Sequence, residues 1–372
     1  MIWYPDMLIK NQHVSNILSM KKIKLYSINI FLIGILFLIL EFLTGNFLFR
    51  QKIDCAYLLC NRKFVYNVDF HHNLTNYQIV YQRDMFGFRD REKKLEDIDI
   101  LTVGGSTTDE RFLKDNDTWS KKLEKKLKLF YNFNFDIVNA GIDGQSTNGH
   151  VWNFDKWFVN LENFSPNFIF FYIGINDILY ESIENYKKEP DHLKKIDIWE
   201  KIKYLIKKNQ GIFYKSYLVI YRKFLLNDKY SVTHSDLRKN VVYQIPTLKL
   251  EIKEKTKLQF ITNLDDLYKK TKKLNSIPIF ITQKTLRGTK IKNKIYSRNN
   301  FDYFSYEKEV AEIITNFCKK KKIYCIDVNK KFYFDLNDTY DLVHLSPSGT
   351  DKLSNMIFKE LQKSIDFNEF KQ

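Results

Sequence analysis

Short apolar runs alternate with amphipathic stretches throughout the chain beyond residue 98, and this alternation limits the possible folds more than any other feature. The apolar runs span residues 98–103, 135–140, 167–173, 277–282 and 323–328. The helical patterns lie near residues 118–130, 148–162, 256–274, 305–320 and 347–364. A strand buried on both faces is apolar along its whole length, so the pattern predicts an α/β fold with a five-stranded parallel sheet between helices. Such sheets bind ligands at the carboxyl ends of their strands.

The composition is that of a globular protein with one large core and room for a small appendage. Of 372 residues, 44% are hydrophobic and 16% aromatic, which is too apolar for a disordered chain. The net charge of +16 would suit nucleic acid or an anionic surface. However, the lysines are spread along the chain, and neither zinc-finger spacing nor an RNA-recognition signature occurs. We therefore expect no nucleic-acid partner, no metal and no other cofactor.

Residues 28–49 form an apolar run about as long as the ~20 residues that a helix needs to cross a bilayer. Three lysines shortly precede the run and two basic residues follow it, so the positive-inside rule places the N-terminus in the cytoplasm. No Ala-x-Ala-like cleavage site follows, which favours an uncleaved signal anchor over a signal peptide or a buried soluble helix. Glu41 is unusual here, because a carboxylate in a span must reach the headgroups or a partner helix.

This topology predicts four segments along the chain. They are a cytoplasmic N-terminus (1–27), a single-pass transmembrane anchor (28–49), a juxtamembrane lead-in (50–94) and the α/β domain (95–368). Residues 180–255 interrupt the alternation with a lysine-rich, aromatic segment that has helical stretches. We expect this segment to be an insertion packed over the site rather than a second domain.

The cysteines fall into two couples, each close together in the sequence. They are Cys55 with Cys60, and Cys318 with Cys325. If the domain lies in the periplasm or at the cell surface, these cysteines can form disulfides. Local pairing within each couple and free, partly buried thiols are both open alternatives.

Gly104-Gly105-Ser106 directly follows the first predicted strand. The glycines let the backbone turn sharply, so we expect Ser106 at an exposed strand-to-loop corner where backbone N–H groups point at an incoming group. A serine so placed can act as a nucleophile. The alternative is an ordinary turn, in which Gly-Gly-Ser also occurs.

Asp341-Leu-Val-His344 provides a candidate base for that serine. Ser346 is a good helix cap and Pro347 a good first helical residue, so His344 is predicted in a loop at a helix entrance. A carboxylate three residues earlier can bond one imidazole nitrogen and hold the other toward a serine. Taken alone, the pair would more simply be two residues of a surface loop.

Two candidate oxyanion donors follow the second and third predicted strands. Gly144 can offer a backbone N–H in a tight turn, and Asn176 can offer its side-chain amide. Ester hydrolysis passes through a tetrahedral oxyanion, and each well-placed donor contributes about 3 kcal/mol. Each of these residues alone could be an ordinary turn residue, but four such elements in this order and on these strand ends argue against coincidence.

These four blocks resemble those of the SGNH hydrolases, also called GDSL-type esterases, over residues 95–368 without the insertion. The resemblance implies a flavodoxin-like three-layer α/β/α fold. It also implies Ser106 as nucleophile, His344 as base, Asp341 as its orienting acid, and Ser106, Gly144 and Asn176 as oxyanion donors. The chain departs from the family at Gly105, where the name-giving motif has Asp.

The blocks say little about the substrate, because this fold serves many ester chemistries. The leading hypothesis is an extracytoplasmic, membrane-anchored esterase that removes an acyl group, such as acetyl, from an envelope glycan or glycolipid. The alternatives are an O-acyltransferase with the same triad and a non-catalytic glycan-binding or scaffolding protein. Gln283, at the end of the fourth strand, is a candidate substrate contact. His150, near the second motif at a helix start, could line the site, but a surface position is favoured.

Overall fold

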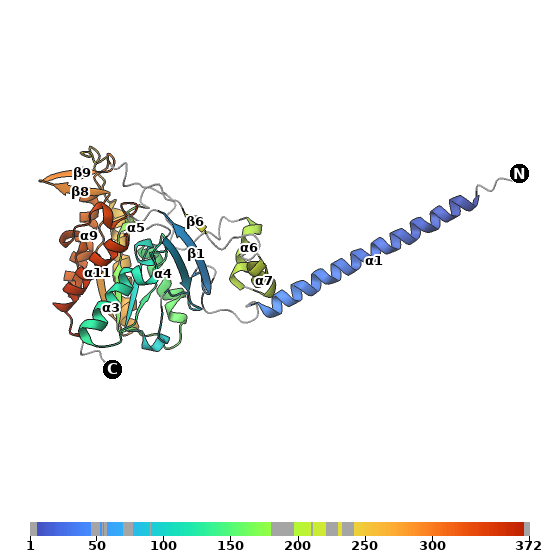
Figure 1. Cartoon of the computed structure of the whole chain (residues 1–372), viewed down its shortest axis with the longest axis horizontal. Coiled ribbons are helices and arrows are strands. Elements are labelled where there is room, and N and C mark those ends of the chain that lie inside the picture. Colours follow the sequence, from blue (N-terminus) through green and yellow to red (C-terminus); the bar gives the residue numbers. More distant parts are fainter. Residues whose placement is uncertain are drawn as a thin grey trace. The chain divides into compact units, whose positions relative to one another are not determined.

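The computed structural model (Figure 1) describes residues 6–45, 53, 55, 58–69, 77–89, 91–179, 197–209, 211–220, 230–232 and 242–367. The chain divides into two compact units, and each is described by itself. One unit comprises Met1–Gln51 and Ile198–Leu225, and the other comprises Lys52–Asp197 and Leu226–Gln372.

The larger unit is built around a five-stranded parallel sheet in the order β10-β7-β5-β3-β4. Its strands are β3 (Ile100–Gly104), β4 (Ile137–Asn139), β5 (Phe168–Tyr172), β7 (Ile277–Ile281) and β10 (Cys325–Ile326). Each strand overlaps one of the predicted apolar runs, so the predicted sheet is confirmed. The first of these strands, β3, lies between the second and the third, which makes its carboxyl end a topological switch point where open α/β sheets bind ligands.

Helices cover both faces of this sheet and complete the three predicted layers. On one face, the core is shared with α4 (Thr147–Lys156), α8 (Glu254–Lys273) and α9 (Tyr303–Lys321). On the other face, it is shared with α3 (Trp119–Tyr131) and α11 (Pro347–Gln362). Alternate residues of each strand enter the two cores, because strand side chains point to opposite faces in turn. Both faces are thus closed to water, which explains the unbroken apolar runs.

The lead-in is part of the larger unit rather than a simple connection. It forms β1 (Arg62–Val68) and β2 (Tyr77–Arg83), which pair antiparallel, and β1 pairs in parallel with β6 (Tyr230–Val232). A separate hairpin consists of β8 (Gly288–Ile291) and β9 (Lys294–Ser297). The remaining short helices are η1 (Leu95–Asp97), α2 (Ser106–Asp109), η2 (Asp115–Asp117), η3 (Phe158–Asn160), α5 (Ile175–Leu179), α10 (Val328–Lys331) and η6 (Leu336–Asp338).

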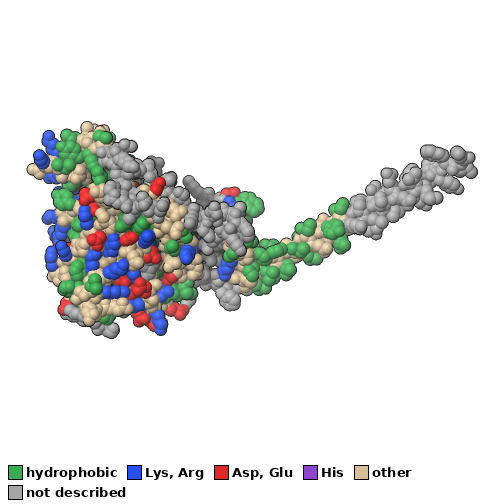
Figure 2. Space-filling model, in the orientation of Figure 1, with side chains coloured by type: hydrophobic (Ala, Val, Ile, Leu, Met, Phe, Trp, Pro, Cys, Tyr) green, Lys and Arg blue, Asp and Glu red, His purple; other side chains and the backbone are tan. Residues whose placement is uncertain are grey.

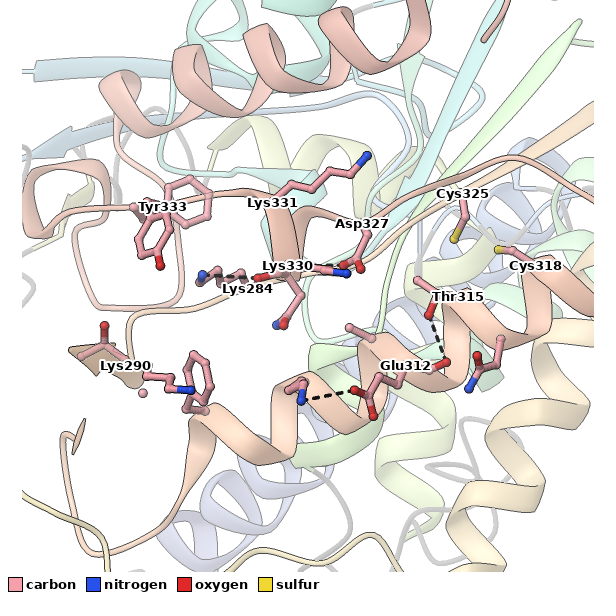
Figure 3. A pocket seen from close by; sticks show the side chains of 18 of the residues that line it. Lys284, Lys290, Glu312, Thr315, Cys318, Cys325, Asp327, Lys330, Lys331 and Tyr333 are labelled. Carbon is pink, nitrogen blue, oxygen red and sulfur yellow. Dashed lines mark hydrogen bonds and ion pairs between the residues drawn. The ribbon is translucent and has the colours of Figure 1, made fainter. Parts of the chain in front are cut away.

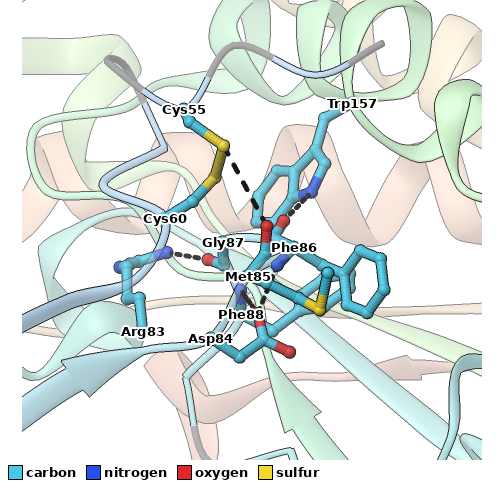
Figure 4. Close-up of a disulfide and its surroundings, with 9 residues drawn as sticks. All are labelled: Cys55, Cys60, Arg83, Asp84, Met85, Phe86, Gly87, Phe88 and Trp157. Carbon is cyan, nitrogen blue, oxygen red and sulfur yellow. Dashed lines mark hydrogen bonds between the residues drawn. A yellow bond between two sulfur atoms is a disulfide. The ribbon is translucent and has the colours of Figure 1, made fainter. Parts of the chain in front are cut away.

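The two cysteine couples differ. Cys55 and Cys60 form a disulfide beside the turn that follows β2 (Figure 4). Cys318 and Cys325 are free thiols. Local pairing is therefore present in the first couple only.

In the turn that follows β2, Phe86 donates its backbone N–H to Asp84 at 2.9 Å, and its carbonyl accepts the indole N–H of Trp157 at 2.7 Å.

The smaller unit contains α1 (Asp6–Thr44), α6 (Ile198–Asn209) and α7 (Ile212–Ile220). Within α1, the 22 residues Ile23–Thr44 have a mean hydropathy of 2.3 and are long and apolar enough to cross a membrane. Hydrophobic side chains cover the coloured part of this helix in Figure 2. Residues 46–49 of the predicted span lie outside the described residues, so its bounds of 28–49 stay a prediction. The predicted packing of the 180–255 insertion over the site stays a prediction.

Candidate active site

Three side chains that are distant in the sequence meet at the carboxyl edge of the sheet. Ser106 begins α2 directly after β3, and His344 lies in the loop before α11. The Ser106 Oγ lies 2.7 Å from His344 Nε2, and His344 Nδ1 lies 2.6 Å from Asp341 Oδ2. The imidazole therefore bridges the hydroxyl and the carboxylate, which is the geometry that base-assisted nucleophilic attack requires.

The spacing of Asp341 and His344 shapes the loop that carries them. Asp341 Oδ1 accepts backbone N–H groups from Val343 at 3.0 Å and His344 at 2.7 Å, which leaves Oδ2 for the imidazole. Leu342 takes a left-handed backbone, with φ of 71°, and its side chain is buried. The predicted cap is confirmed, because the Ser346 hydroxyl accepts a backbone N–H in the first turn of α11.

The environment keeps Asp341 ionised beside the imidazole. Burial acts to raise the pKa of Asp341, but the hydrogen bonds and charge of His344 outweigh burial and lower that pKa below its ordinary value. The side chain of His344 is 26% exposed and that of Asp341 only 12%, so the imidazole reaches solvent while the carboxylate is shielded. The ring of Tyr340 stacks on the imidazole, with 5.6 Å between ring centroids, and limits its rotation.

Both candidate oxyanion donors lie at this same edge. Gly144, in the turn after β4, has φ of 71°, a backbone conformation that favours glycine. Asn176 lies in α5 after β5 and donates one N–H of its side-chain amide to the carbonyl of Gln145 at 2.8 Å. An amide nitrogen carries two hydrogens, so the second N–H of Asn176 can serve a ligand. The structure therefore brings the four predicted blocks together.

Steric crowding explains why position 105 is a glycine. A Cβ atom built on Gly105 would collide with the side-chain amide of Asn176 and would lie 2.9 Å from the carbonyl oxygen of Gln145. An aspartate, as in the family motif, could not occupy this position with Asn176 where it is. The departure from the motif therefore matches the close approach of Asn176 to the nucleophile turn.

A buried polar network holds the Gly144 turn. His150 is 1% exposed, not at the surface as expected, and its Nδ1 lies 2.9 Å from the Oε1 atom of Gln145. Asn153 exchanges two hydrogen bonds with the same Gln145 side chain, at 2.8 and 2.9 Å. Burial lowers the pKa of His150 to about 3, so the ring is neutral and Nδ1–H donates to Gln145. The expectation for His150 was wrong because a histidine at a helix start gives no sequence sign of its burial.

Gln283 lies at the predicted strand end, but its side chain is engaged by the protein. Its Nε2 donates to Thr107 Oγ1 at 2.7 Å and to the Tyr172 carbonyl at 3.1 Å, and its Oε1 accepts the backbone N–H of Ile175 at 2.7 Å. Gln283 thus ties β7 to the residue after Ser106 and to the start of α5. Its role as a substrate contact stays a prediction.

Side chains from the lead-in form hydrogen bonds with the end of α2, a contact that the motifs did not predict. Asp109, the last residue of α2, accepts hydrogen bonds from Tyr81 at 2.7 Å and Arg83 at 2.7 Å. Arg89 donates to the carbonyl oxygens of Glu110 at 2.8 Å and of Leu113 at 2.6 Å. The available sequence signal was the period-two pattern of β2, where Arg83 shares the buried face of Tyr81.

A separate hollow of about 1220 Å³ lies beside β10 and α9 (Figure 3) and does not include the candidate triad. Many lysines line it, and Lys284 Nζ donates to the carbonyl oxygens of Asn329 at 3.3 Å and Phe332 at 2.7 Å. Burial lowers the pKa of Lys284. Among the residues that the structure describes, no group of three or more His, Cys, Asp or Glu side chains is placed to hold a metal ion.

Several solved structures are similar to this chain, whereas no protein-family model and no curated protein matches it. A catalytic mutant of an acetylxylan esterase from Geobacillus stearothermophilus is 13% identical, with 73% of this chain and 95% of that chain covered and a TM-score of 0.41. A GDSL-like lipase from Bacteroides thetaiotaomicron is 13% identical, with 74% and 92% covered and a TM-score of 0.39. At such identities the similarity concerns the fold alone.

Replacement of Gly105 by alanine tests the coupling between the nucleophile turn and Asn176. We expect Gly105→Ala to displace the Asn176 amide and to lower kcat for a small ester about 10²-fold, as for the loss of one oxyanion donor. Asn176→Ala should have a similar effect, and the double variant should be little worse than either single variant. Fully additive losses in this cycle would show that position 105 acts independently of Asn176.

The buried His150 predicts a pH dependence of stability. Its pKa falls from 6.5 to about 3 on folding, so between these values the unfolded chain binds more protons than the folded chain. The free energy of unfolding should therefore decrease as the pH falls below 6.5, by up to about 1.4 kcal/mol per pH unit. His150→Asn keeps an N–H donor near Nδ1 without titrating, so denaturant unfolding from pH 7.5 to 5.0 should show a flatter dependence. Equal slopes for the two proteins would exclude His150 as the cause.

Proposed function

We propose that this protein is an SGNH-type serine esterase, held in a membrane by its N-terminal helix, that hydrolyses acyl esters such as acetyl esters on an envelope glycan or glycolipid. The observation that carries the proposal is the chain of two hydrogen bonds from Ser106 through His344 to Asp341, at 2.7 and 2.6 Å. This contact favours a catalytic role for Asp341 and His344 over that of two ordinary surface-loop residues, because the imidazole bonds a serine 238 residues away in the sequence.

In the first half of the reaction, Ser106 Oγ attacks the ester carbonyl carbon and His344 Nε2 takes the hydroxyl proton. Asp341 holds Nδ1–H and stabilises the imidazolium that forms. The backbone N–H groups of Ser106 and Gly144 and the Asn176 amide donate hydrogen bonds that stabilise the negative charge on the carbonyl oxygen. The tetrahedral intermediate then collapses: the C–O bond to the alcohol breaks, and His344 returns the proton to the leaving oxygen.

In the second half, water replaces the alcohol. His344 takes a proton from the water, whose oxygen attacks the acyl carbon, and the bond to Ser106 Oγ breaks with return of the proton to that oxygen. If a sugar hydroxyl enters in place of water, the same steps give O-acyl transfer. The acceptor alone thus separates the esterase from the acyltransferase alternative.

The proposed location rests on α1 and on the disulfide. The exposed apolar stretch of α1 can cross a bilayer, and the lysines that precede it favour a cytoplasmic N-terminus. The Cys55–Cys60 disulfide suits an oxidising compartment beyond the span. The substrate is then an ester of the cell envelope rather than of the cytoplasm.

Loss of Ser106 or of His344 should abolish ester turnover. For purified full-length protein and p-nitrophenyl acetate, we expect Ser106→Ala and His344→Ala to lower kcat by about 10⁶-fold or to background. Asp341→Asn should cost less, about 10⁴-fold, because it disturbs only the tautomer and charge support of the imidazole. A fluorophosphonate probe should label Ser106 in the parent protein and not in Ser106→Ala.

The matched control is Ser364→Ala, which changes an exposed serine beyond the far end of α11 and should keep parental activity. Parental activity in Ser106→Ala would refute the proposal. Product analysis with an acetylated glycan, with and without a second glycan as acceptor, distinguishes release of acetate from transfer.

The topology has its own test. We expect a C-terminal alkaline phosphatase fusion to be active and a C-terminal GFP fusion exported by the general pathway to be dark, because the C-terminus lies outside the cytoplasm. A bright GFP fusion together with an inactive phosphatase fusion would place the domain in the cytoplasm and contradict the proposed location.

A further inference from the structure

Glu41, the one carboxylate of the apolar stretch, has a partner in the smaller unit. Its Oε2 accepts the backbone N–H of Phe213 at 2.8 Å, in the first turn of α7. The neighbouring Thr44 Oγ1 accepts the backbone N–H of Ile212 at 3.0 Å. The first N–H groups of a helix lack intrahelical acceptors and carry partial positive charge, so a carboxylate stabilises them. Glu41 therefore caps a second helix rather than facing lipid alone.

The contact between α1 and α7 is close and includes apolar groups. A Cβ atom on Gly211, the residue before α7, would collide with the Glu41 carboxylate. The rings of Phe37 and Phe213 lie with centroids 4.4 Å apart. The start of α7 is therefore attached to the last turns of the apolar stretch, near its end at Thr44.

The segment that follows residue 197 carries an exposed apolar face. On α6 the exposed large apolar side chains are Ile198, Trp199, Ile202, Leu205 and Ile206. Their spacing places them on one face of the helix. On α7 the exposed ones are Ile212, Tyr217, Val219 and Ile220. Water-exposed apolar surface of this extent, on two neighbouring helices, indicates an apolar environment.

Basic residues occupy other positions of α6. Lys201, Lys203 and Lys208 fall outside the apolar face of this helix. A helix with lysines on one face and tryptophan, leucine and isoleucine on the other is typical of segments that lie in the membrane interface. Tryptophan in particular favours the headgroup level of a bilayer. The contact of α7 with α1, a helix long and apolar enough to cross a membrane, favours a bilayer as this environment.

We propose that α6 and α7 (198–220) form an interfacial membrane-binding segment that lies in the surface of the phospholipid bilayer beside the anchor, with Glu41 as its point of attachment. The inference rests on the proposed anchor. It assigns to this part of the 180–255 insertion a lipid partner: the apolar face enters the acyl boundary, and the lysines contact phosphate and anionic headgroups.

The test uses the full-length protein reconstituted in vesicles of phosphatidylcholine and phosphatidylglycerol. The fluorescence of Trp199 is taken as the difference between the parent and Trp199→Phe. We expect phosphatidylcholine brominated near the headgroup end of its acyl chains to quench most of this difference signal. Glu41→Leu, which removes the cap, should reduce the quenching and increase hydrogen exchange at residues 211–215, whereas Glu41→Gln, which keeps an acceptor, should change both less.

A matched pair of substitutions checks the orientation. Ile202→Glu on the apolar face should weaken quenching at Trp199, and Lys201→Glu on the basic face should affect it less. Hydrolysis of p-nitrophenyl acetate in detergent should stay at the parental level in both variants.

The possible failures are distinguishable. An intact mass that includes residues 1–45, combined with no bromolipid quenching, would overturn this inference and leave the anchor and the esterase proposal standing. A mature chain that begins beyond residue 45 would overturn the anchor and this inference together. Shielding of Trp199 in detergent that depends on protein concentration, without quenching by lipid, would assign the face to a second copy of the chain and also overturn the inference.

Discussion

The buried ion pair between Arg83 and Asp109 is the contact on which the position of the proposed nucleophile depends. The two side chains are 2% and 1% exposed and their charged atoms lie 2.7 Å apart. A buried carboxylate is tolerated only when it is paired, and the loss of one partner of such a pair typically costs about 3–5 kcal/mol. Because Asp109 ends α2 and Arg83 ends β2, the pair fixes the four-residue helix that begins with Ser106 to the small sheet beneath it.

The other contacts of α2 add to this constraint from different directions. Gln283 holds Thr107 from the end of β7, and the side-chain amide of Asn139 donates to the carbonyl of Thr108 at 2.6 Å from the end of β4. Gly105 leaves room for Asn176 from the end of β5. A helix this short has little stability of its own, so its position is set by these neighbours. Preorganisation of the proposed nucleophile is thus distributed over the whole sheet edge.

Much of the architecture could be predicted because it depends on local pattern. Strands covered on both faces must be apolar throughout, as in β5, where all five residues are buried. Parallel strands then force their following loops to one edge, so Ser106, Gly144 and Asn176 could be grouped from their positions in the sequence alone. The turn at Asp341 could also be predicted, because it is local. The Asp341 carboxylate accepts the backbone N–H groups two and three residues later in the chain.

The features that escaped prediction depend on contacts between distant segments. The burial of His150, the engagement of Gln283 and the support of α2 by Arg83 require knowledge of which surfaces pack together, and one sequence does not contain that information in local form. Glu41 was recognised as unusual because of its apolar neighbours, but its partner Phe213 lies 172 residues away. Polar groups of this kind are visible in the sequence, whereas their partners are not.

The order of the proposed catalytic residues along the chain has a consequence for biosynthesis. His344 follows Ser106 by 238 residues, and α11, which holds its loop, packs its Leu353 and Ile357 into the same core as Trp119 of α3. A nascent chain therefore presents the proposed nucleophile without the proposed base until residue 344 has been made. A chain shortened before α11 would hold Ser106 without the imidazole beside it, so the proposed activity would require the segment that packs α11 onto α3.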